Sequence, residues 1–351
     1  MLFGIQFTDA SAADAITTES SSMVGRISEL LDSAADEGFS GAVWREKDDA
    51  LIFEQAYGLA NPREEITFTI GTVHQIGSIS KQFTAVAAAK LATENKLDLH
   101  VPISTYVEGH SYLSEITLHQ ALTHSAGLPD YCGDDFANRS REEVFNYCLR
   151  RVISSDNTGE VSYSNLGYIL AAAVIEEVTG QLFENYLETE ILNPLGLDET
   201  GYFFPSKDTA EFAHGKRRRR RQEENIAIEL AELEGDHWNI MGSGGMQSTL
   251  HDMRVWKSAL MSESSLDPAI RENVLTPHAM EAENLYVGYG WYVRSTSENQ
   301  IRQYSHSGSD GMFFSYLLVR PLENLSLYFV GSNGEEEALT VLREILAALP
   351  G

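Results

Sequence analysis

The chain has few cysteines and no long apolar run. Its two cysteines, Cys132 and Cys148, lack the spacing of a metal site and do not require an oxidising compartment. We expect two free thiols, although a disulfide between them is compatible with the sequence. No stretch of about 18 uninterrupted apolar residues is present, so the sequence predicts no membrane-spanning helix.

Basic residues are also scarce. Against 25 Lys and Arg residues stand 52 Asp and Glu residues, which gives a formal net charge of −27. A field of this sign repels nucleic acid and anionic membranes, so neither is an expected partner. Salt-adapted proteins have such surfaces, and so do acidic proteins from ordinary organisms; both interpretations stay open.

Metal and phosphate motifs are missing. His119 and His124 are five residues apart and His237 follows Asp236, but no His-Glu-x-x-His motif or cysteine cluster accompanies them. Residues 242–246 read GSGGM and lack the Gly-Lys-Ser/Thr of a phosphate loop. We therefore expect no metal and no cofactor, and we interpret the glycines as allowing close backbone approach at a cleft wall.

The first residues are compatible with export. Residues 10–15 read ASAADA, like the end of a secretory signal, but no Lys or Arg precedes Arg26. The alternative is that residues 1–23 form a flexible leader. We expect a periplasmic or secreted protein, with a cytoplasmic one as the alternative.

The most informative pattern is Ser78-Ile-Ser-Lys81, placed directly before an apolar run at residues 83–89. Residues three apart share a helix face, so a helix beginning near Ser78 brings the Lys81 amine beside the Ser78 hydroxyl. A partly desolvated lysine can remove the proton that keeps a serine from being nucleophilic. The alternative is a serine that caps a helix, followed by an ordinary lysine.

Two further short elements follow. Tyr163-Ser164-Asn165 is the sole Tyr-x-Asn of the chain, and His306-Ser307-Gly308 precedes a strand-like run. Tyr163 could be an ordinary buried tyrosine, but the order Ser-x-x-Lys, Tyr-x-Asn, His-x-Gly resembles the serine β-lactamase and penicillin-binding-protein superfamily. The branch it resembles most holds class C β-lactamases, D-alanyl-D-alanine carboxypeptidases, D-aminopeptidases and family VIII esterases.

The resemblance covers roughly residues 24–349. Other segments share it: residues 122–131 (LTHSAGLPDY), 163–168 (YSNLGY), 178–180 (VTG), 193–197 (NPLGL) and 242–246 (GSGGM). It implies that Ser78 forms an acyl-enzyme and that Lys81 and Tyr163 share the proton transfers, in an order that a coupled pair leaves open.

The resemblance also assigns the rest of the site. Asn165 is expected to bind a substrate amide and to help position Lys81. Backbone N–H groups of Ser78 and Ser309 are expected to hold the oxyanion, with His306, Ser307 and Gly308 lining the substrate site.

The sequence departs from β-lactamases at His306, where those enzymes usually have the lysine of Lys-Thr-Gly. A histidine is mostly neutral at pH 7, so recognition of a β-lactam carboxylate should weaken. We therefore expect a hydrolase of small esters or D-amino-acid peptides. The alternatives are a class C-type β-lactamase and a non-catalytic penicillin-binding or partner-binding protein.

The pattern of elements predicts an α+β fold, with an antiparallel sheet flanked by N- and C-terminal helices and a mostly helical domain. We expect residues 24–75 and 240–351 to form the sheet domain and residues 76–239 the helical one, with the site in the cleft between them. The predicted elements are helices at 23–35 and 335–349, a hairpin at 41–45 and 50–57, and strands at 286–294, 301–306, 313–320 and 325–331.

One segment fits an acidic protein poorly. Residues 216–221 read KRRRRR, a run that could bind an acidic partner or form a solvated loop. Nearby acidic residues favour the loop. In the resembled family this stretch is variable and would border the cleft.

Overall fold

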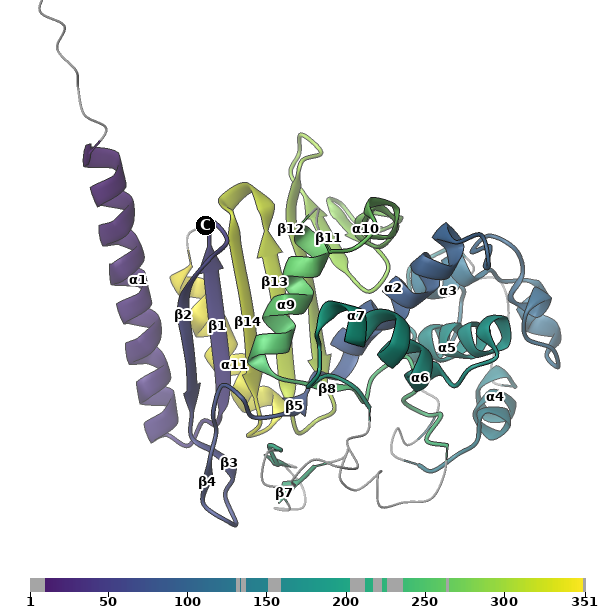
Figure 1. The fold of residues 1–351 in the computed structure, drawn as a ribbon, viewed down its shortest axis with the longest axis horizontal. Helices are drawn as coiled ribbons and strands as arrows, with labels where there is room; N and C mark the ends of the chain where they lie inside the picture. The colour runs from purple at the N-terminus through teal and green to yellow at the C-terminus, as the bar shows by residue number, and fades with distance from the viewer. Residues whose placement is uncertain are drawn as a thin grey trace, which may run out of the picture.

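The computed structural model describes residues 10–130, 133, 137–150, 159–202, 212–216, 223–225, 236–262 and 265–349. An antiparallel sheet of eight strands, in the order β2-β1-β14-β13-β12-β11-β10-β9, forms its centre (Figure 1). The strands are β1 Gly41–Lys47, β2 Ala50–Tyr57, β9 Ala279–Ala282, β10 Leu285–Val287, β11 Tyr292–Ser295, β12 Ile301–Ser309, β13 Phe314–Arg320 and β14 Leu325–Gly331. Because β1 pairs with β14, the two ends of the chain build one sheet.

Both faces of the sheet are covered, which explains why every residue of β14 is buried. Leu327 and Phe329 point toward α1 (Ala10–Asp36) and α11 (Glu335–Ala348), where they join one apolar core. Tyr328 and Val330 point to the opposite face. Alternating side chains of a central strand thus serve two cores.

The opposite face carries α9 (Leu250–Met261) and leads into a helical region on one side of the sheet (Figure 1). The stacked rings of Phe83 and Trp256, with centroids 3.9 Å apart, join α2 (Ser80–Thr93) to α9. Within the described residues, the other α-helices are α3 Leu118–Leu122, α4 Arg141–Leu149, α5 Asn165–Thr179, α6 Phe183–Leu187, α7 Asn193–Leu195 and α10 Pro268–Leu275. Short strands complete the fold: β3 Leu59–Asn61, β4 Ile66–Thr67, β5 His74–Gln75, β6 Gly215–Lys216, β7 Glu223–Glu224 and β8 Gln247–Ser248.

Helix α5 shows how local sequence sets an element. Ser164 caps its start by accepting a hydrogen bond from Gly167 N–H, and Gly180 ends it in the left-handed region at φ 69°. Between them the helix is apolar on all sides and its first ten residues after Asn165 are buried. A helix of this kind belongs to a core.

The predicted α+β class and its antiparallel sheet are confirmed, as are the hairpin and the closing helix. Several predicted boundaries were wrong. The strand predicted at 301–306 continues to Ser309 as β12, so it includes the whole His-Ser-Gly motif. The predicted strand at 286–294 is two strands, because the chain turns at Gly290 (φ 76°), and β9 was not predicted. The first helix begins at Ala10, so the predicted helix start at residue 23 is too late; residues 1–9 lie outside the described part.

Cys148 is disulfide-bonded, which corrects the expectation of free thiols. The other cysteine, Cys132, lies outside the described residues. Of the basic run at 216–221, Lys216 belongs to β6 and residues 217–221 lie outside them as well. Among the helices in the described ranges, no single one combines the length and the apolarity needed to cross a membrane.

Candidate active site

Ser78 lies in a single 3₁₀ turn, Gly77–Ile79, that leads directly into α2. The turn is tight because Gly77 adopts φ +50°, and a Cβ there would lie 2.6 Å from the backbone nitrogen of Ser309. The Ser80 hydroxyl secures the turn by donating to Gly77 O at 2.6 Å. Ser78 is thus held where the start of α2 meets the end of β12.

Lys81 is completely buried, and its amine is the centre of the site. Its Nζ donates to Ser78 Oγ at 3.0 Å, to Asn165 Oδ1 at 2.7 Å and to the Ser243 carbonyl at 2.6 Å. The expected contact between the amine and the hydroxyl is therefore present. These three acceptors match the three N–H donors of an ammonium group.

Tyr163 lies directly over this amine. Its ring centroid is 5.0 Å from Lys81 Nζ, 4.4 Å from the ring of His124 and 6.4 Å from that of His306. Tyr163 and Asn165 flank the N-cap of α5, so one helix start delivers both side chains to Lys81. The Asn165 amide also donates to Asp130 Oδ1 at 3.3 Å.

His306 lies on β12 and is buried. Its Nδ1 pairs with the Ser307 carbonyl at 2.6 Å, and its ring centroid is 5.7 Å from that of Tyr292 on β11. Burial, followed by the nearby charge of Lys81, lowers the pKa of His306 to about 3. The imidazole is therefore neutral near pH 7 and supplies no fixed cation.

The end of β12 passes close to the serine turn. A Cβ on Gly308 would lie 2.0 Å from Ile76 O, so only a glycine allows this approach. Ser309 follows, with its backbone nitrogen beside Gly77. Ser309 N thus lies beside the turn that carries Ser78, and an oxyanion site made of the Ser78 and Ser309 N–H groups stays a prediction.

The glycine-rich segment at 242–246 packs closely against α5, as its predicted close backbone approach requires. Gly242 adopts φ +75° and approaches α5 so closely that a Cβ would meet Tyr168 O at 2.5 Å. Its carbonyl accepts a hydrogen bond from Thr84 at 2.7 Å, which ties the segment to α2. This close approach brings the Ser243 carbonyl to the Lys81 amine.

The structure thus places Ser78, Tyr163, Asn165 and His306 around the amine of Lys81. Sequence reasoning missed four neighbours: Ser243, His124, Asp130 and Tyr292. His124 and Asp130 belong to the segment at 122–131 that carried the family resemblance, so a signal for them existed. Ser243 acts through its carbonyl, which has no signature in the side-chain sequence.

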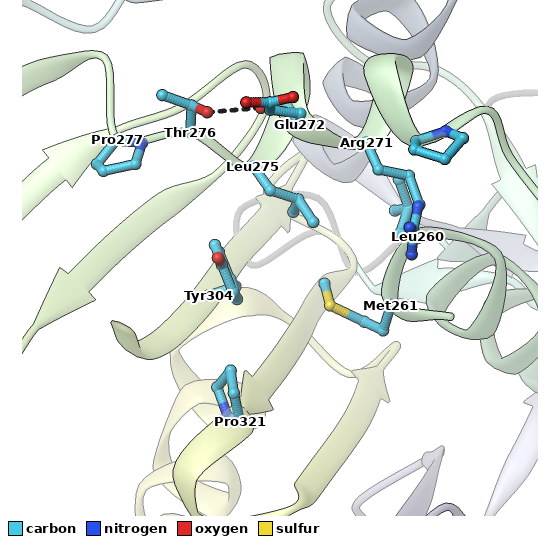
Figure 2. Close-up of a pocket in the computed structure, with 10 residues that line it drawn as sticks. Leu260, Met261, Arg271, Glu272, Leu275, Thr276, Pro277, Tyr304 and Pro321 are labelled. Carbon is cyan, nitrogen blue, oxygen red and sulfur yellow. Dashed lines mark hydrogen bonds between the residues drawn. The ribbon is translucent and has the colours of Figure 1, made fainter. Parts of the chain in front are cut away.

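A separate groove of about 500 Å³ lies between α10, the end of α9 and β12, and is lined in part by Arg271, Leu275, Tyr304 and Pro321 (Figure 2). Its lining includes none of the residues around Ser78. Among the described residues, no three His, Cys, Asp or Glu side chains are placed to share a metal ion.

The family model described as Beta-lactamase matches residues 27–349. The chain belongs to this family. Similar curated proteins include penicillin-binding protein 4* of Bacillus subtilis, 25% identical over 85% of this chain and 69% of that protein. Another is the D-alanyl-D-alanine-carboxypeptidase/endopeptidase AmpH of Escherichia coli, 23% identical over 79% of this chain and 75% of that protein.

Solved structures agree with the family assignment. A penicillin binding protein from Bacillus halodurans has a TM-score of 0.77 at 25% identity, covering 92% of this chain and all of that one. The fold is therefore that of β-lactamases and transpeptidases, as the resemblance of the motifs predicted. The chain is a β-lactamase-like member of a family of serine hydrolases.

Proposed function

We propose that this protein hydrolyses small esters or D-amino-acid peptides through an acyl-enzyme on Ser78. The observation that supports this most is the buried Lys81 amine, which contacts Ser78 Oγ while Asn165 and Ser243 hold it in place. A lysine fixed beside a serine at a helix start has the geometry of a base and its nucleophile.

The contacts of Lys81 suggest how the base works. When the ammonium loses one proton, two N–H donors remain for Asn165 Oδ1 and Ser243 O, and the lone pair faces Ser78 Oγ. The neutral amine then keeps its position and accepts the hydroxyl proton. Tyr163, whose ring centroid lies 5.0 Å from the amine, exchanges the proton with it.

In the first half-reaction, Ser78 Oγ bonds to the substrate carbonyl carbon as its proton passes to the Lys81–Tyr163 pair. Backbone N–H groups of Ser78 and Ser309 stabilise the negative carbonyl oxygen. The bond to the leaving alcohol or amine breaks, and the pair returns the proton to it. Water then attacks the acyl carbon and gives a proton to the same pair. The bond from this carbon to Ser78 Oγ breaks, the pair returns the proton to Oγ, and the carboxylic acid leaves.

The neutral His306 is the reason for favouring esters and D-amino-acid peptides over β-lactams. A lysine at this position would present a permanent cation to a substrate carboxylate, whereas the buried imidazole does not. The name of the Escherichia coli relative, a carboxypeptidase and endopeptidase for D-alanyl-D-alanine, supports the peptide option. The names of the penicillin-binding relatives support β-lactam acylation as the alternative.

The test combines labelling and turnover. Intact-mass analysis after a fluorophosphonate or a labelled penicillin should show one adduct, which is lost in Ser78→Ala and kept in a variant of an exposed serine, Ser114→Ala. The kcat/KM for a short nitrophenyl ester should exceed that for a chromogenic cephalosporin, and His306→Lys should narrow the difference. An adduct that persists in Ser78→Ala would reject the mechanism, and absence of both adduct and turnover would favour a non-catalytic binding protein.

We also propose that the protein works in the periplasm or outside the cell. The disulfide at Cys148 supports this, because disulfides persist mainly in oxidising compartments. Fractionation of the source cells, followed by thiol alkylation before and after reduction, tests it. Free thiols in a cytoplasmic fraction would favour the cytoplasmic alternative.

A further inference from the structure

Two segments that are distant in sequence, residues 122–130 and 159–168, are joined by a series of hydrogen bonds. In each bond the second segment donates to a carbonyl of the first. The pairs are Gly159 N with Ser125 O (2.7 Å), Ser162 N with His124 O (2.7 Å), Ser164 Oγ with Pro129 O (2.8 Å), Asn165 N with Asp130 O (3.4 Å) and Tyr168 Oη with Leu122 O (2.8 Å). The first segment therefore determines where Tyr163 and Asn165 lie.

His124 differs from its neighbours because its side chain also takes part. Its Nδ1 accepts a hydrogen bond from Ser164 N–H at 3.1 Å, while its carbonyl accepts from Ser162 N–H. His124 thus binds the backbone on both sides of Tyr163. Its ring lies against the Tyr163 ring, with centroids 4.4 Å apart, and the residue as a whole is only 3% exposed.

We propose that His124 is a positioning residue of the hydrolase site, whose unprotonated Nδ1 and ring hold Tyr163 over the Lys81 amine. The inference rests on the proposed function, in which Tyr163 exchanges protons with Lys81. His124 itself bonds to backbone and packs on Tyr163, so it acts through that residue.

The protonation state agrees with this role. A protonated Nδ1 would point its hydrogen at Ser164 N–H, and the hydrogen bond would be lost. The groups around the ring are Lys81 of α2, His306 of β12, and Tyr163 and Tyr168 at the start of α5. Burial, then the charge of Lys81, holds the pKa of His124 well below its usual range, so the accepting form persists.

The backbone conformation of His124 allows substitutions that separate the role of its Nδ1 acceptor from the role of its ring. His124 has φ +56°, a left-handed conformation that asparagine tolerates better than most residues. His124→Asn keeps this conformation and supplies a carbonyl oxygen near the place of Nδ1, but it removes the ring. His124→Phe keeps an aromatic ring and removes the acceptor.

The experiment measures kcat and KM for a nitrophenyl ester in both variants, each alone and combined with Tyr163→Phe. We expect His124→Phe to lower kcat about 100-fold with little change in KM, because small displacements of a reacting group are costly. His124→Asn should recover a large part of the loss. In the Tyr163→Phe background, His124→Phe should cost less than about threefold, since residues that act as a unit are non-additive. His119→Phe is the matched control and should keep the wild-type kcat, because His119 lies in α3, just before residues 122–130, and its side chain pairs with Tyr289 Oη.

Several results would overturn the proposal. Equal losses in the Asn and Phe variants would show that the Nδ1 acceptor is unimportant. A full loss from His124→Phe in the Tyr163→Phe background, or the same loss in the His119→Phe control, would show general damage to the fold. Failure of the proposed function looks different: Tyr163→Phe alone would then leave the turnover unchanged.

Discussion

Gly77 and Ser309 meet backbone to backbone at the point where the first turn of α2 touches the end of β12. A Cβ on Gly77 would lie 2.6 Å from Ser309 N, and Gly77 has φ +50°. The close approach of the Gly77 and Ser309 backbones sets the distance between the turn that carries Ser78 and β12, the strand that is expected to complete the oxyanion site. It therefore ties the fold to the proposed chemistry.

Gly77→Ala should separate these two backbones. The unfavourable φ should cost about 1–3 kcal/mol of unfolding free energy, and the displaced oxyanion donors should lower kcat by roughly 100-fold. Chemical denaturation and ester turnover measure the two effects. The matched control is Gly25→Ala in α1, where a Cβ meets nothing within 4 Å, and which should be neutral or stabilising. An alanine at position 77 with normal turnover would contradict the assignment of this turn.

Lys81 and Tyr163 should behave as one proton-transfer unit. Lys81→Ala and Tyr163→Phe should each lower kcat by about 10²–10⁴-fold. The double variant should lose much less than the product of the two single losses. Steady-state kinetics of all four proteins give the coupling directly, and full additivity would assign the two residues to separate steps.

Buried histidines should make the protein less stable in acid. Burial lowers the pKa of His74 to about 4, below the value of about 6.5 expected in the unfolded chain. Between these pH values the unfolded chain binds more protons, so the free energy of unfolding falls as the pH drops from about 6.5 toward 4. His306 acts in the same direction.

Denaturation curves at pH 7, 6 and 5 measure this slope. His74→Gln should reduce it by up to about 1.4 kcal/mol per pH unit, because one titrating site is removed. The slope is the informative quantity, since the substitution also disturbs the bonds of His74 to Thr72 O and Tyr328 Oη. An unchanged slope would mean that His74 is not the responsible group.

The net charge of −27 predicts that salt stabilises the protein. Self-repulsion opposes the folded state and is screened over about 10 Å at 0.1 M ionic strength. The Tm should rise as NaCl increases from low to molar concentration. This rise in Tm should be larger than the rise caused by an uncharged osmolyte such as sucrose. A flat curve would leave an acidic protein without salt adaptation.

The sequence by itself determined the local geometry of this protein. Residues three apart share a helix face wherever a helix forms, so the proximity of Ser78 and Lys81 followed from their spacing. The apolar, aromatic and β-branched residues at 313–320 and 325–331, which favour strands, are likewise a property of neighbours along the chain. The order of the three motifs, which resembles that of the family, then predicted that Tyr163, Asn165 and His306 belong to the same site.

Only the tertiary structure decided how these parts meet. The third acceptor of Lys81 is the carbonyl of Ser243, a group that every residue carries and that no sequence pattern marks. The hydrogen bond from Ser164 N–H to His124 Nδ1 and the contact of Gly77 with Ser309 join segments that are distant in sequence. The pKa of His306 depends on burial by several elements at once. These contacts and this pKa arise from packing between elements, so they cannot be predicted from the order of residues along one element.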